Sequence, residues 1–504
     1  MVDEFNALVQ AGIWTLVPRQ STMNVLPNKW VFRIKRHSDG SIQRHKARLV
    51  ANDFHQQEGL DFGETFSPVV NHATICLILA FSVQFSWPVR QLDVQNAFLH
   101  GYLTDEVYMR QPRGFEDPQY PNHVCRLRRS LYGLKQAPRA WFHCFLSHLE
   151  DLGFRSSKAD YSLFTYYSGS IRIYLLIYVD DILITGNHPG HISTLISSLG
   201  RLFSMKDLGN VHYFLGMEIN RSSSGLSLTQ TKYITGLLLH TQMVDAKPVS
   251  TPAAPGKRLS ISDGDPLPEP TQFRSIVGAL QYLTLTRPDI AFAVNQVSQF
   301  MHKPTSAHWV AVKRILRYLK GTITYGLLYT PSSLSLTAYS DADYAGDPDD
   351  RHSTGGYCLY LGSNLISWSS KKQGGVSRSS TEAEYRQMAY TTAALSWFRS
   401  LFCDLHLHLA CLRLWCDNIS AISLASNPVF HARTRHVEID YHFVREKVVR
   451  GELLVRYVST IDQLADIFTK GLSPVRFRFL ATKLPVRARP VSLQGCVKPV
   501  KPNN

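Results

Sequence analysis

Two adjacent aspartates, Asp180 and Asp181, lie in the middle of the most apolar stretch of the chain, IRIYLLIYVDDILIT at 171–185. Burying two carboxylates among aliphatic side chains costs free energy unless a cation pairs with them. A solvent-exposed hairpin turn is the plain alternative, but neither Gly nor Asn stands at this turn. We therefore predict two strands, 172–179 and 182–185, whose junction presents the Asp pair to a positively charged partner.

A third carboxylate, Asp93, ends the predicted strand 88–94 and completes a candidate metal site. A strand-end Asp beside an Asp-Asp hairpin suits two Mg²⁺ ions held about 3.5–4 Å apart. Mg²⁺ prefers hard oxygen ligands and keeps other positions for water and phosphate, so few carboxylates suffice. Two such metal ions activate an attacking 3′-hydroxyl and neutralise a departing pyrophosphate, and Mn²⁺ is the usual substitute for Mg²⁺.

The composition indicates a folded protein that meets a polyanion. The 504 residues include 54 Lys and Arg against 39 Asp and Glu, a net charge of +15 with neutral histidines. Hydrophobic residues make up 44% and charged residues 18%, which excludes an intrinsically disordered chain. The positive charge is spread along the chain without a basic tail, which favours globular domains that bind nucleic acid.

The spacing of the cysteines and the length of the apolar segments indicate the kind of cellular compartment in which the protein works. The eight cysteines show no C-x-x-C spacing, which argues against a zinc ribbon or a redox pair. The N-terminus MVDEFNALVQ is acidic and unlike a secretory signal, and the runs 73–87 and 171–185 are too short to span a membrane. We expect a soluble protein of a reducing compartment with no membrane partner.

The predicted elements form an α+β domain followed by an α/β domain. In the first part we expect helices at 3–11, 73–87, 138–152 and 190–203, a hairpin of 30–36 and 42–50 turning at Asp39-Gly40, a loop at 100–122, and strands at 211–219 and 225–229. A proline-rich crossing at 245–270 leads to three helices within 271–320. We then expect strands at 335–340, 355–361, 364–369 and 412–416, with helices at 380–402, 418–426, 437–450 and 461–470.

Six blocks in the first half have a family likeness: KWVFRIKRHSDGSIQRHKARLVA, ETFSPVV, QLDVQNAFLHG, LYGLKQAPRAWF, YVDDILITG and FLGMEI. With these blocks, residues 14–245 resemble the reverse transcriptase of copia-type LTR retrotransposon polyproteins. The resemblance implies that Asp93, Asp180 and Asp181 are the metal-binding triad of a right-hand polymerase palm. One departure is Asn52-Asp53, where the family usually has a lysine and a glycine.

The resemblance also implies residues that bind the nucleotide. Lys46 and Arg48 would belong to the fingers and meet the incoming triphosphate, which a cation pair on one β-ribbon suits. Phe98 would stand under the sugar and exclude a 2′-hydroxyl, although an aromatic at such a place is otherwise most often part of a core. Tyr132, in the block LYGLKQAP, would border the nucleotide and the template.

Cations surround Tyr132, and basic groups with an interleaved aromatic suit a nucleic-acid groove. They are Arg126, Arg128, Arg129, Lys135 and Arg139. By resemblance, Gly216 and Met217 in the block FLGM belong to the turn that holds the primer end.

Four carboxylates in the C-terminal part follow the order strand-Asp, helix-Glu, strand-Asp, helix-Asp, which is the order of ribonuclease H. They are Asp341, Glu384, Asp417 and Asp466. Each is ordinary alone, because Asp after a strand is a common helix cap. The copia-type resemblance covers them in the blocks AYSDADYAGD, SRSSTEAEY, WCDN and QLADIFTK, and implies two metal ions that cleave the RNA strand of an RNA–DNA hybrid.

Two nearby carboxylates compete with this set, Asp343 for Asp341 and Glu382 for Glu384. We prefer Asp341 and Glu384 because Asp341 is nearer the strand end and Ala383-Glu384 matches the family block. His436 and His442, expected on one helix near this site, are better explained as structural residues.

We therefore predict an α+β fold, a right-hand polymerase (fingers, palm and thumb) followed by an α/β ribonuclease H-like domain. The expected domains are fingers and palm at 1–245, a proline-rich crossing and helical thumb or connection at 246–330, the ribonuclease H-like domain at 331–474, and a poorly ordered tail at 475–504. The expected function is RNA-directed DNA synthesis with cleavage of the RNA in the hybrid, and Mg²⁺ at both sites.

Two rival functions stay open. The chain could be a catalytically inactive relic that only binds nucleic acid, which the Asn52-Asp53 departure and the lack of protease, zinc-knuckle and integrase motifs favour and the intact carboxylates oppose. A nuclease built on the C-terminal site alone would leave the Asp180-Asp181 hairpin unexplained.

The expected partners are an RNA template, a DNA primer, RNA–DNA hybrid and dNTPs. The sequence leaves open a homodimer or an association with other retrotransposon products. It also leaves open whether the protein works in the cytoplasm, within a virus-like particle, or in the nucleus.

Overall fold

The computed structural model describes residues 1–36, 41–256, 258–426 and 438–489. The chain divides into two compact units. Unit 1 contains Met1–Thr74 and Trp87–Val211, and unit 2 contains Ile75–Ser86 and His212–Asn504. In the described part of the chain, no helix is both long and apolar enough to cross a membrane.

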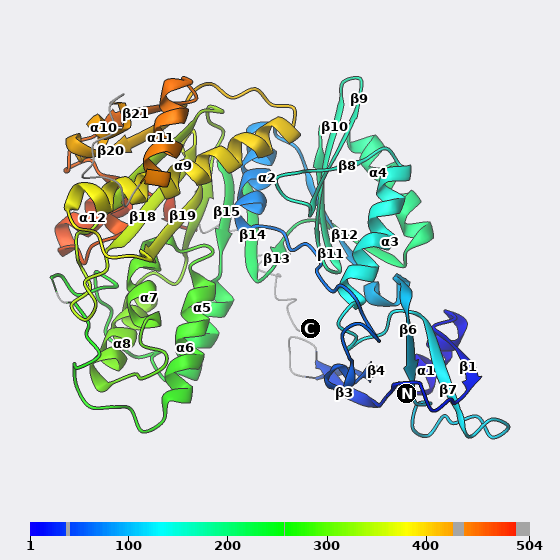
Figure 1. Cartoon of the computed structure of the whole chain (residues 1–504). Coiled ribbons are helices and arrows are strands. Elements are labelled where there is room, and N and C mark those ends of the chain that lie inside the picture. The colour runs from blue at the N-terminus through cyan, green and yellow to red at the C-terminus, as the bar shows by residue number, and fades with distance from the viewer. Residues whose placement is uncertain (37–40, 257, 427–437, 490–504) are drawn as a thin grey trace, which may run out of the picture. The chain divides into compact units, whose positions relative to one another are not determined.

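Unit 1 is built around a six-stranded sheet in the order β12-β5-β11-β10-β9-β8 (Figure 1). Its strands are β5 (Val89–Val94), β8 (Arg155–Ser156), β9 (Leu163–Ser168), β10 (Ile171–Tyr178), β11 (Asp181–Gly186) and β12 (Met205–Asn210). Alternate residues such as Ile173, Leu175 and Ile177 share one face, because successive side chains of a strand point to opposite faces. The helices α3 (Ala137–Asp151) and α4 (Pro189–Leu202) pack against that face.

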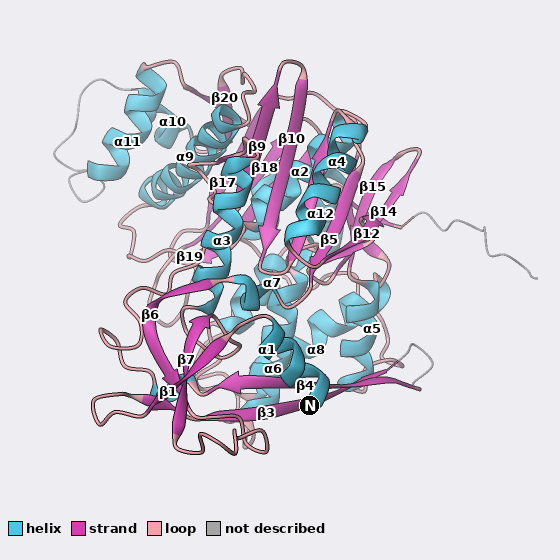
Figure 2. Cartoon of the chain, turned by 90° about the vertical axis from the view of Figure 1, so that its right-hand side faces the viewer, coloured by secondary structure: helices cyan, strands magenta, loops and turns pink. Residues whose placement is uncertain are grey.

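A second sheet and a separate hairpin complete unit 1. The sheet has the order β1-β7-β6-β2 and consists of β1 (Trp14–Pro18), β2 (Val25–Leu26), β6 (Tyr102–Met109) and β7 (His123–Arg129). The hairpin pairs β3 (Asn28–Arg36) with β4 (Ile42–Ala51), the long ribbon in Figure 2. The short helices are α1 (Val2–Gln10), η1 (Asp53–His55) and η2 (Ala97–His100). Helix α2 (His72–Gln84) passes from unit 1 into unit 2.

The first part of unit 2 is an antiparallel sheet with helices. The sheet has the order β13-β14-β15-β16-β22 and consists of β13 (Tyr213–Phe214), β14 (Met217–Ser222), β15 (Gly225–Thr229), β16 (Tyr325–Tyr329) and β22 (Val486–Ala488). The helices are α5 (Thr231–His240), α6 (Pro270–Leu283), η3 (Pro288–Ile290), α7 (Ala291–Ser298) and α8 (Ser306–Gly321).

The second part of unit 2 is a mixed sheet in the order β19-β18-β17-β20-β21. Its strands are β17 (Leu336–Ala342), β18 (Thr354–Leu361), β19 (Asn364–Lys372), β20 (Leu412–Cys416) and β21 (Leu453–Tyr457). Strands β20 and β21 run parallel to β17, whereas β18 and β19 continue it as an antiparallel meander. The helices are α9 (Ser380–Asp404), α10 (Ile419–Ser426), α11 (Glu438–Val449), η5 (Leu464–Phe468) and α12 (Pro474–Lys483).

Two of the sequence predictions are wrong in part. The predicted loop 100–122 contains β6, which pairs with β7 and β2 although Gly and Pro flank it. The tail is ordered up to 489, because Pro474 starts α12 where its missing N–H costs nothing, and β22 pairs with β16. Residues 490–504 lie outside the described residues, as do the predicted turn Asp39-Gly40 and His436.

The division into units also differs from the predicted boundaries at 245 and 330. Residues 213–229 join unit 2, because β15 pairs with β16 and β16 with β22. The predicted strand 211–219 is broken at Leu215-Gly216, and the predicted helix 461–470 is the short 3₁₀ helix η5.

Candidate active sites

The first candidate site lies where β5 and β11 run side by side. In their antiparallel pairing, Asp93 stands directly opposite Asp181, and residues so placed have Cβ atoms about 4.5–5.5 Å apart. The Val94 N–H donates to the Asp180 carbonyl oxygen at 2.9 Å, which holds the turn against β5. The structure thus brings the three predicted carboxylates to one place, with Asp180 exposed and the other two half-buried.

The turn that carries the Asp pair is strained. Because Tyr178 pairs with Asp181, only Val179 and Asp180 form the turn. Val179 has a φ of 57°, a left-handed conformation that is unfavourable for a β-branched side chain. The indole Nε1 of Trp141, buried on α3, donates to the Val179 carbonyl oxygen at 2.7 Å and supports this conformation. The sequence analysis did not identify Trp141 as a functional residue. The one available signal was the absence of Gly at the turn, which indicates that another side chain must stabilise the turn conformation.

Charge repulsion is built into this site. Burial raises the pKa of Asp181, and the carboxylates of Asp180 and Asp93 raise it further. Gln91 opposes this shift by donating from Nε2 to Asp181 Oδ1 at 3.3 Å. A divalent cation among the three carboxylates would relieve the repulsion.

Tyr132 links the predicted nucleotide-binding residues. The guanidinium carbon of Arg48 lies 4.7 Å from the centre of the Tyr132 ring, and the Phe98 ring meets that ring edge-on at 5.7 Å between centres. The Tyr132 hydroxyl donates to Asn96 Oδ1 at 3.2 Å. Burial raises the pKa of Tyr132, and the nearby carboxylate of Asp180 adds to the effect. Arg48, Phe98 and Tyr132 therefore lie together and close to the first candidate site.

The end of the hairpin is anchored to the segment around Tyr132. The Ala51 N–H donates to the Tyr132 carbonyl oxygen at 2.8 Å. Gly133 has a φ of 90°, and a Cβ there would lie 2.1 Å from the Ala51 carbonyl oxygen, so the close approach requires glycine. Lys46 lies two residues before Arg48 on the same face of β4. Burial lowers the pKa of Lys46, and repulsion from Arg48 lowers it further.

Most of the predicted template- and primer-binding cations also contact groups within unit 1. The pairs are Arg126 with Glu106, Arg129 with the Tyr102 hydroxyl, Arg139 with Glu64, and Lys135 over the Phe62 ring. Arg128 is exposed. These contacts hold the side chains at the surface of the unit.

Gly216 and Met217 lie in unit 2, at the turn between β13 and β14. The Tyr282 hydroxyl donates to the Leu215 carbonyl oxygen at 2.7 Å. Gly216 has a φ of 71°, and a Cβ on it would collide with the Tyr282 hydroxyl. Met217 is buried, so its side chain supports the turn rather than forming its surface.

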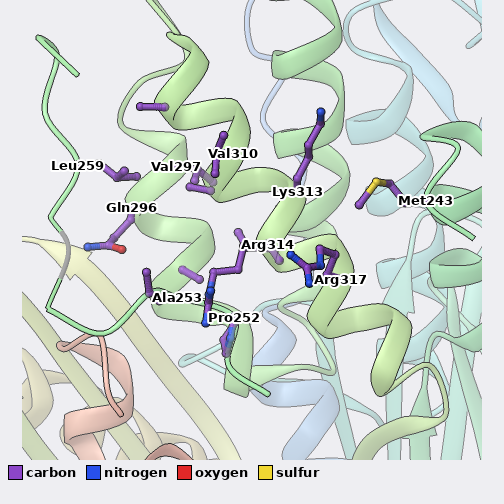
Figure 3. Close-up of a pocket in the computed structure, with 15 residues that line it drawn as sticks. Met243, Pro252, Ala253, Leu259, Gln296, Val297, Val310, Lys313, Arg314 and Arg317 are labelled. Atoms are coloured by element: carbon purple, nitrogen blue, oxygen red, sulfur yellow. The ribbon is translucent and has the colours of Figure 1, made fainter. Parts of the chain in front are cut away.

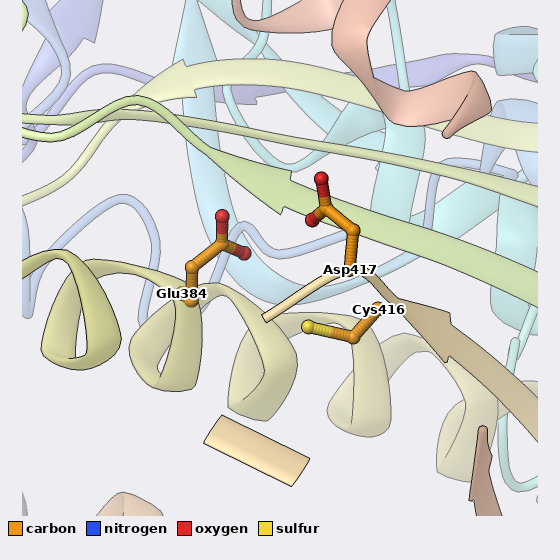
Figure 4. Close-up of side chains that lie close together, drawn as sticks. All are labelled: Glu384, Cys416 and Asp417. Atoms are coloured by element: carbon orange, nitrogen blue, oxygen red, sulfur yellow. The ribbon is translucent and has the colours of Figure 1, made fainter. Parts of the chain in front are cut away.

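The second candidate site lies in unit 2, where β17 and β20 run parallel beside α9. Asp341 is the next-to-last residue of β17, and Asp417 directly follows β20. Glu384 lies on α9, and Asp466 lies in η5. Asp341, Glu384 and Asp466 are buried, and Asp417 is half-buried. Donor atoms of Glu384, Asp417 and Cys416 all lie within 4.8 Å of one another (Figure 4).

The four carboxylates of this site interact with one another. Burial raises the pKa of Asp341 to about 6, with Lys470 opposing the rise and Asp466 and Asp417 adding to it. Burial, Asp341 and Asp417 raise the pKa of Glu384 well above its usual value. Glu384 Oε2 is buried and has no hydrogen-bond partner among the described residues. The set therefore has the charge and the unsatisfied oxygen expected of a cation site.

Two cations already neutralise half of this set. Lys470 Nζ lies 2.6 Å from Asp466 Oδ1 and 3.2 Å from Asp341 Oδ1, and Arg476 Nη2 lies 3.1 Å from Asp466 Oδ2. Burial alone would lower the pKa of Lys470, but the two carboxylates raise it above its usual value. Sequence reasoning missed Lys470, although its spacing of four residues after Asp466 is a signal for an ion pair.

The two competing carboxylates have other partners. Glu382 pairs with Arg386 at 2.8 Å and accepts from the Arg378 N–H at 2.8 Å. Asp343 accepts a short hydrogen bond from the Thr354 N–H. The choice of Asp341 and Glu384 over Asp343 and Glu382 stays a prediction.

A cavity of about 300 Å³ lies elsewhere in unit 2, between α7, α8, residues 252–254 and Leu259 (Figure 3). Apolar side chains such as Val297 line it, and Arg314 and Arg317 lie at its side. Arg314 Nη2 donates to Thr251 Oγ1 at 2.7 Å. Of the described residues that line this cavity, none belongs to the predicted sites.

Comparison with known proteins identifies the family. A family model described as reverse transcriptase (RNA-dependent DNA polymerase) matches residues 11–255. The retrovirus-related Pol polyprotein from transposon RE1 of Arabidopsis thaliana is 52% identical over 98% of this chain and 34% of that polyprotein. The putative transposon Ty5-1 protein of Saccharomyces cerevisiae is 37% identical over 58% of this chain and 97% of that protein. The chain belongs to the copia-type retrotransposon Pol family.

This copia-type chain spans about one third of the RE1 polyprotein, 34% of its length. The first candidate site lies within the residues matched by the reverse transcriptase model, and the second lies beyond them in the stretch shared with RE1. A solved structure of a foamy viral protease–reverse transcriptase with dsDNA aligns over 90% of this chain and 79% of that one, at 13% identity and a TM-score of 0.24. That score is too low to bear on the fold.

Proposed function

We propose that this copia-type chain is an RNA-directed DNA polymerase that also cleaves the RNA strand of RNA–DNA hybrids. The observation that carries the proposal is the register of β5 and β11, which sets Asp93 opposite Asp181 and beside Asp180. The reverse transcriptase family model supports the same reaction. The partners would be an RNA template, a DNA primer, dNTPs and the hybrid product.

Both carboxylate sets fit divalent metal, with Mg²⁺ as the expected ion. Their donors are hard oxygens, and burial together with like charges raises the pKa of one member of each set, Asp181 in the first and Glu384 in the second. Asp93, Asp180 and Asp181 would hold the metal in the first site, and Asp341, Glu384, Asp417 and Asp466 in the second. Bound metal ions would supply Lewis-acid activation of a hydroxyl or water and neutralise the leaving group.

The residues around the first site would place the substrates. Arg48 and Lys46 would bind the triphosphate of the incoming nucleotide, because guanidinium and ammonium groups pair strongly with phosphate oxygens. Phe98, packed against Tyr132, would limit the space beneath the sugar. Trp141 would keep the strained Val179 turn in place, so that Asp180 stays beside Asp93.

The parts of a right hand can be proposed from the same elements. The six-stranded sheet with α3 and α4 would be the palm, and the β3–β4 ribbon the fingers. Helices α6, α7 and α8 would be the thumb or connection, with Gly216-Met217 at the primer end. The β17–β21 sheet with α9 would be the ribonuclease H-like domain.

Primer extension tests the polymerase. The purified chain receives an RNA template, a labelled DNA primer, dNTPs and Mg²⁺, beside an Asp180→Asn/Asp181→Asn variant. A matched control is Glu150→Gln/Asp151→Asn, because this adjacent acidic pair is exposed at the end of α3 in the same unit. We expect extension by the wild type and the control and none by the first variant. Extension that survives the first variant, or its absence from a folded wild type, would overturn the proposal.

Cleavage of a hybrid labelled on its RNA strand tests the second centre. Glu384→Gln should abolish cleavage while primer extension continues. Glu446→Gln is the control, since Glu446 pairs with Arg450 on the surface of α11. Equal cleavage by Glu384→Gln and the wild type would exclude this centre.

A further inference from the structure

Cys416 lies beside the second candidate site, and nothing in the proposed reaction uses it. It is the last residue of β20, directly before Asp417, and its side chain is fully buried. Its Sγ and carboxylate oxygens of Glu384 and Asp417 lie within 4.8 Å of one another. Figure 4 shows these side chains, from α9 and from the end of β20, gathered in one place.

We propose that Cys416, Glu384 and Asp417 form a binding site for a thiophilic divalent cation, Zn²⁺ or Cd²⁺. Such an ion would occupy two carboxylates of the proposed ribonuclease H-like centre and exclude Mg²⁺ from them. The inference shares these residues with the proposed function, but its test measures binding and does not depend on activity.

The spacing of the donor atoms fits a single ion. Zinc takes sulfur ligands at about 2.3 Å and carboxylate oxygens at about 2.0–2.2 Å, so two ligands of one tetrahedral ion lie about 3.4–3.6 Å apart. The three donor atoms lie within 4.8 Å of one another and would close around the ion by an inward shift of about 1 Å, which rotation of the side chains can supply. Three protein ligands leave a fourth position for water, as in open zinc sites.

The charges around the three residues also favour a cation there. Lys470 and Arg476 pair with Asp341 and Asp466, whereas neither Glu384 nor Asp417 has an ion pair among the described residues. Asp417 receives hydrogen bonds only from the neutral groups of Thr460 and Gln463, among the described residues.

Glu384 provides the independent sign of a missing ligand. The residue is only 6% exposed, and its Oε2 is buried without a hydrogen-bond partner in the described part of the chain. A buried oxygen left unsatisfied costs free energy, which a bound ion would recover.

The thiol decides which ion is preferred. Sulfur is a poor ligand for Mg²⁺ and a good one for Zn²⁺ and Cd²⁺, which also bind mixed sites more tightly than Mg²⁺. Burial and the carboxylate of Glu384 raise the pKa of the Cys416 thiol, and the Asn418 N–H, which donates to Sγ at 3.4 Å, opposes this rise in part. Binding would release the thiol proton to solvent as the metal–sulfur bond forms.

Cadmium binding tests the site directly, because a cadmium–thiolate bond gives an ultraviolet charge-transfer band. The starting protein is the full chain with Cys403→Ser, Cys411→Ser and Cys496→Ser, which removes the two exposed cysteines and one outside the described residues. We expect the band to saturate at one Cd²⁺ per chain, and at least tenfold more Mg²⁺ than Cd²⁺ should be needed to suppress it.

Two further variants identify the ligands. Adding Cys416→Ser should remove the band and weaken Cd²⁺ binding at least tenfold, and adding Glu384→Gln should weaken binding while the thiol remains. If Cys416→Ser unfolds the chain, the Glu384→Gln result alone decides. No band in the starting protein, or Cd²⁺ binding unchanged by both variants, would overturn the proposal, whereas loss of hybrid cleavage alone would bear only on the proposed function.

Discussion

Asp93 and Asp181 stand directly opposite each other on the neighbouring antiparallel strands β5 and β11. Eighty-odd residues separate them in the sequence, and the pairing of two buried strands brings them together. Because side chains alternate between the faces of a strand, a shift of this register by one residue would turn one carboxylate to the other face. The register is therefore as important to the proposed chemistry as the residues themselves.

Removing the strain at the Val179 turn should slow primer extension without lowering the unfolding free energy. Val179→Gly removes a left-handed valine, whose strain costs about 1–3 kcal/mol, and adds about 0.5–1 kcal/mol of backbone entropy to the unfolded chain. We expect an unchanged or slightly higher unfolding free energy but slower primer extension, because Asp180 loses its fixed position. Urea denaturation and single-turnover extension measure the two effects. A variant that is both less stable and fully active would contradict this account of the turn.

Gly133 should not tolerate a methyl group. Gly133→Ala places a Cβ 2.1 Å from the Ala51 carbonyl oxygen, at a φ of 90°. We expect a loss of roughly 2–4 kcal/mol in unfolding free energy, from backbone strain together with the clash. Gly114→Ala is the matched control, since Gly114 has a φ of 84° with open space around it. If both variants lost equal stability, strain alone would account for the effect and the anchoring contact would be irrelevant.

The stability of unit 2 should depend on pH through Asp341 when divalent metal is absent. Its pKa is raised from 3.8 to about 6 by burial, so the folded state holds the proton more tightly than the unfolded state. This contribution is fully present below pH 3.8 and is lost as the pH rises through about 6. Asp341→Asn, which does not titrate, should therefore gain stability relative to the wild type between pH 4 and 7, by roughly 2–3 kcal/mol.

Urea denaturation with a chelator at several pH values measures this difference. Asp462→Asn is the control, because Lys483 lowers the pKa of the exposed Asp462 and its pH dependence has the opposite sign. A stability difference between Asp341→Asn and the wild type that stays constant with pH would refute the prediction.

The buried pair of Arg287 and Asp289 should be essential for the helices of unit 2. Arg287 is fully buried, and its Nη2 lies 2.7 Å from Asp289 Oδ2. Arg287→Met leaves the carboxylate without its cation, and we expect a loss of about 3–5 kcal/mol in unfolding free energy. Arg287→Lys should not restore it, because an ammonium cannot make the two parallel hydrogen bonds of a guanidinium.

A double variant checks that interpretation. Arg287→Met/Asp289→Leu should recover most of the lost stability, since no charge then remains buried. Arg450→Met, which breaks only an exposed pair with Glu446, should change the stability by less than about 1 kcal/mol. Equal losses in the single and double variants would show that packing, and not charge, is at stake.

Local patterns in the sequence predicted the parts of the fold with strong periodicity. The hairpin of β10 and β11, the helix α9 and the strand β17 are confirmed near their predicted bounds. Strand β6 was missed because Gly and Pro residues surround it and its pairing with β7 and β2 is not a local property. Helix α12 was not predicted because the prolines of the C-terminal segment are typical of irregular structure. Proline is also common at the first position of a helix, and Pro474 starts α12.

The sequence by itself determined which residue types carry the chemistry, because an Asp pair inside an apolar run and a set of carboxylates at strand ends are visible without a structure. Only the tertiary structure decided which of them meet. It places Asp93 against Asp181, Lys470 between Asp341 and Asp466, and Cys416 beside Glu384. These relationships depend on strand register and on packing between distant segments, and the local spacing of residues does not specify either one.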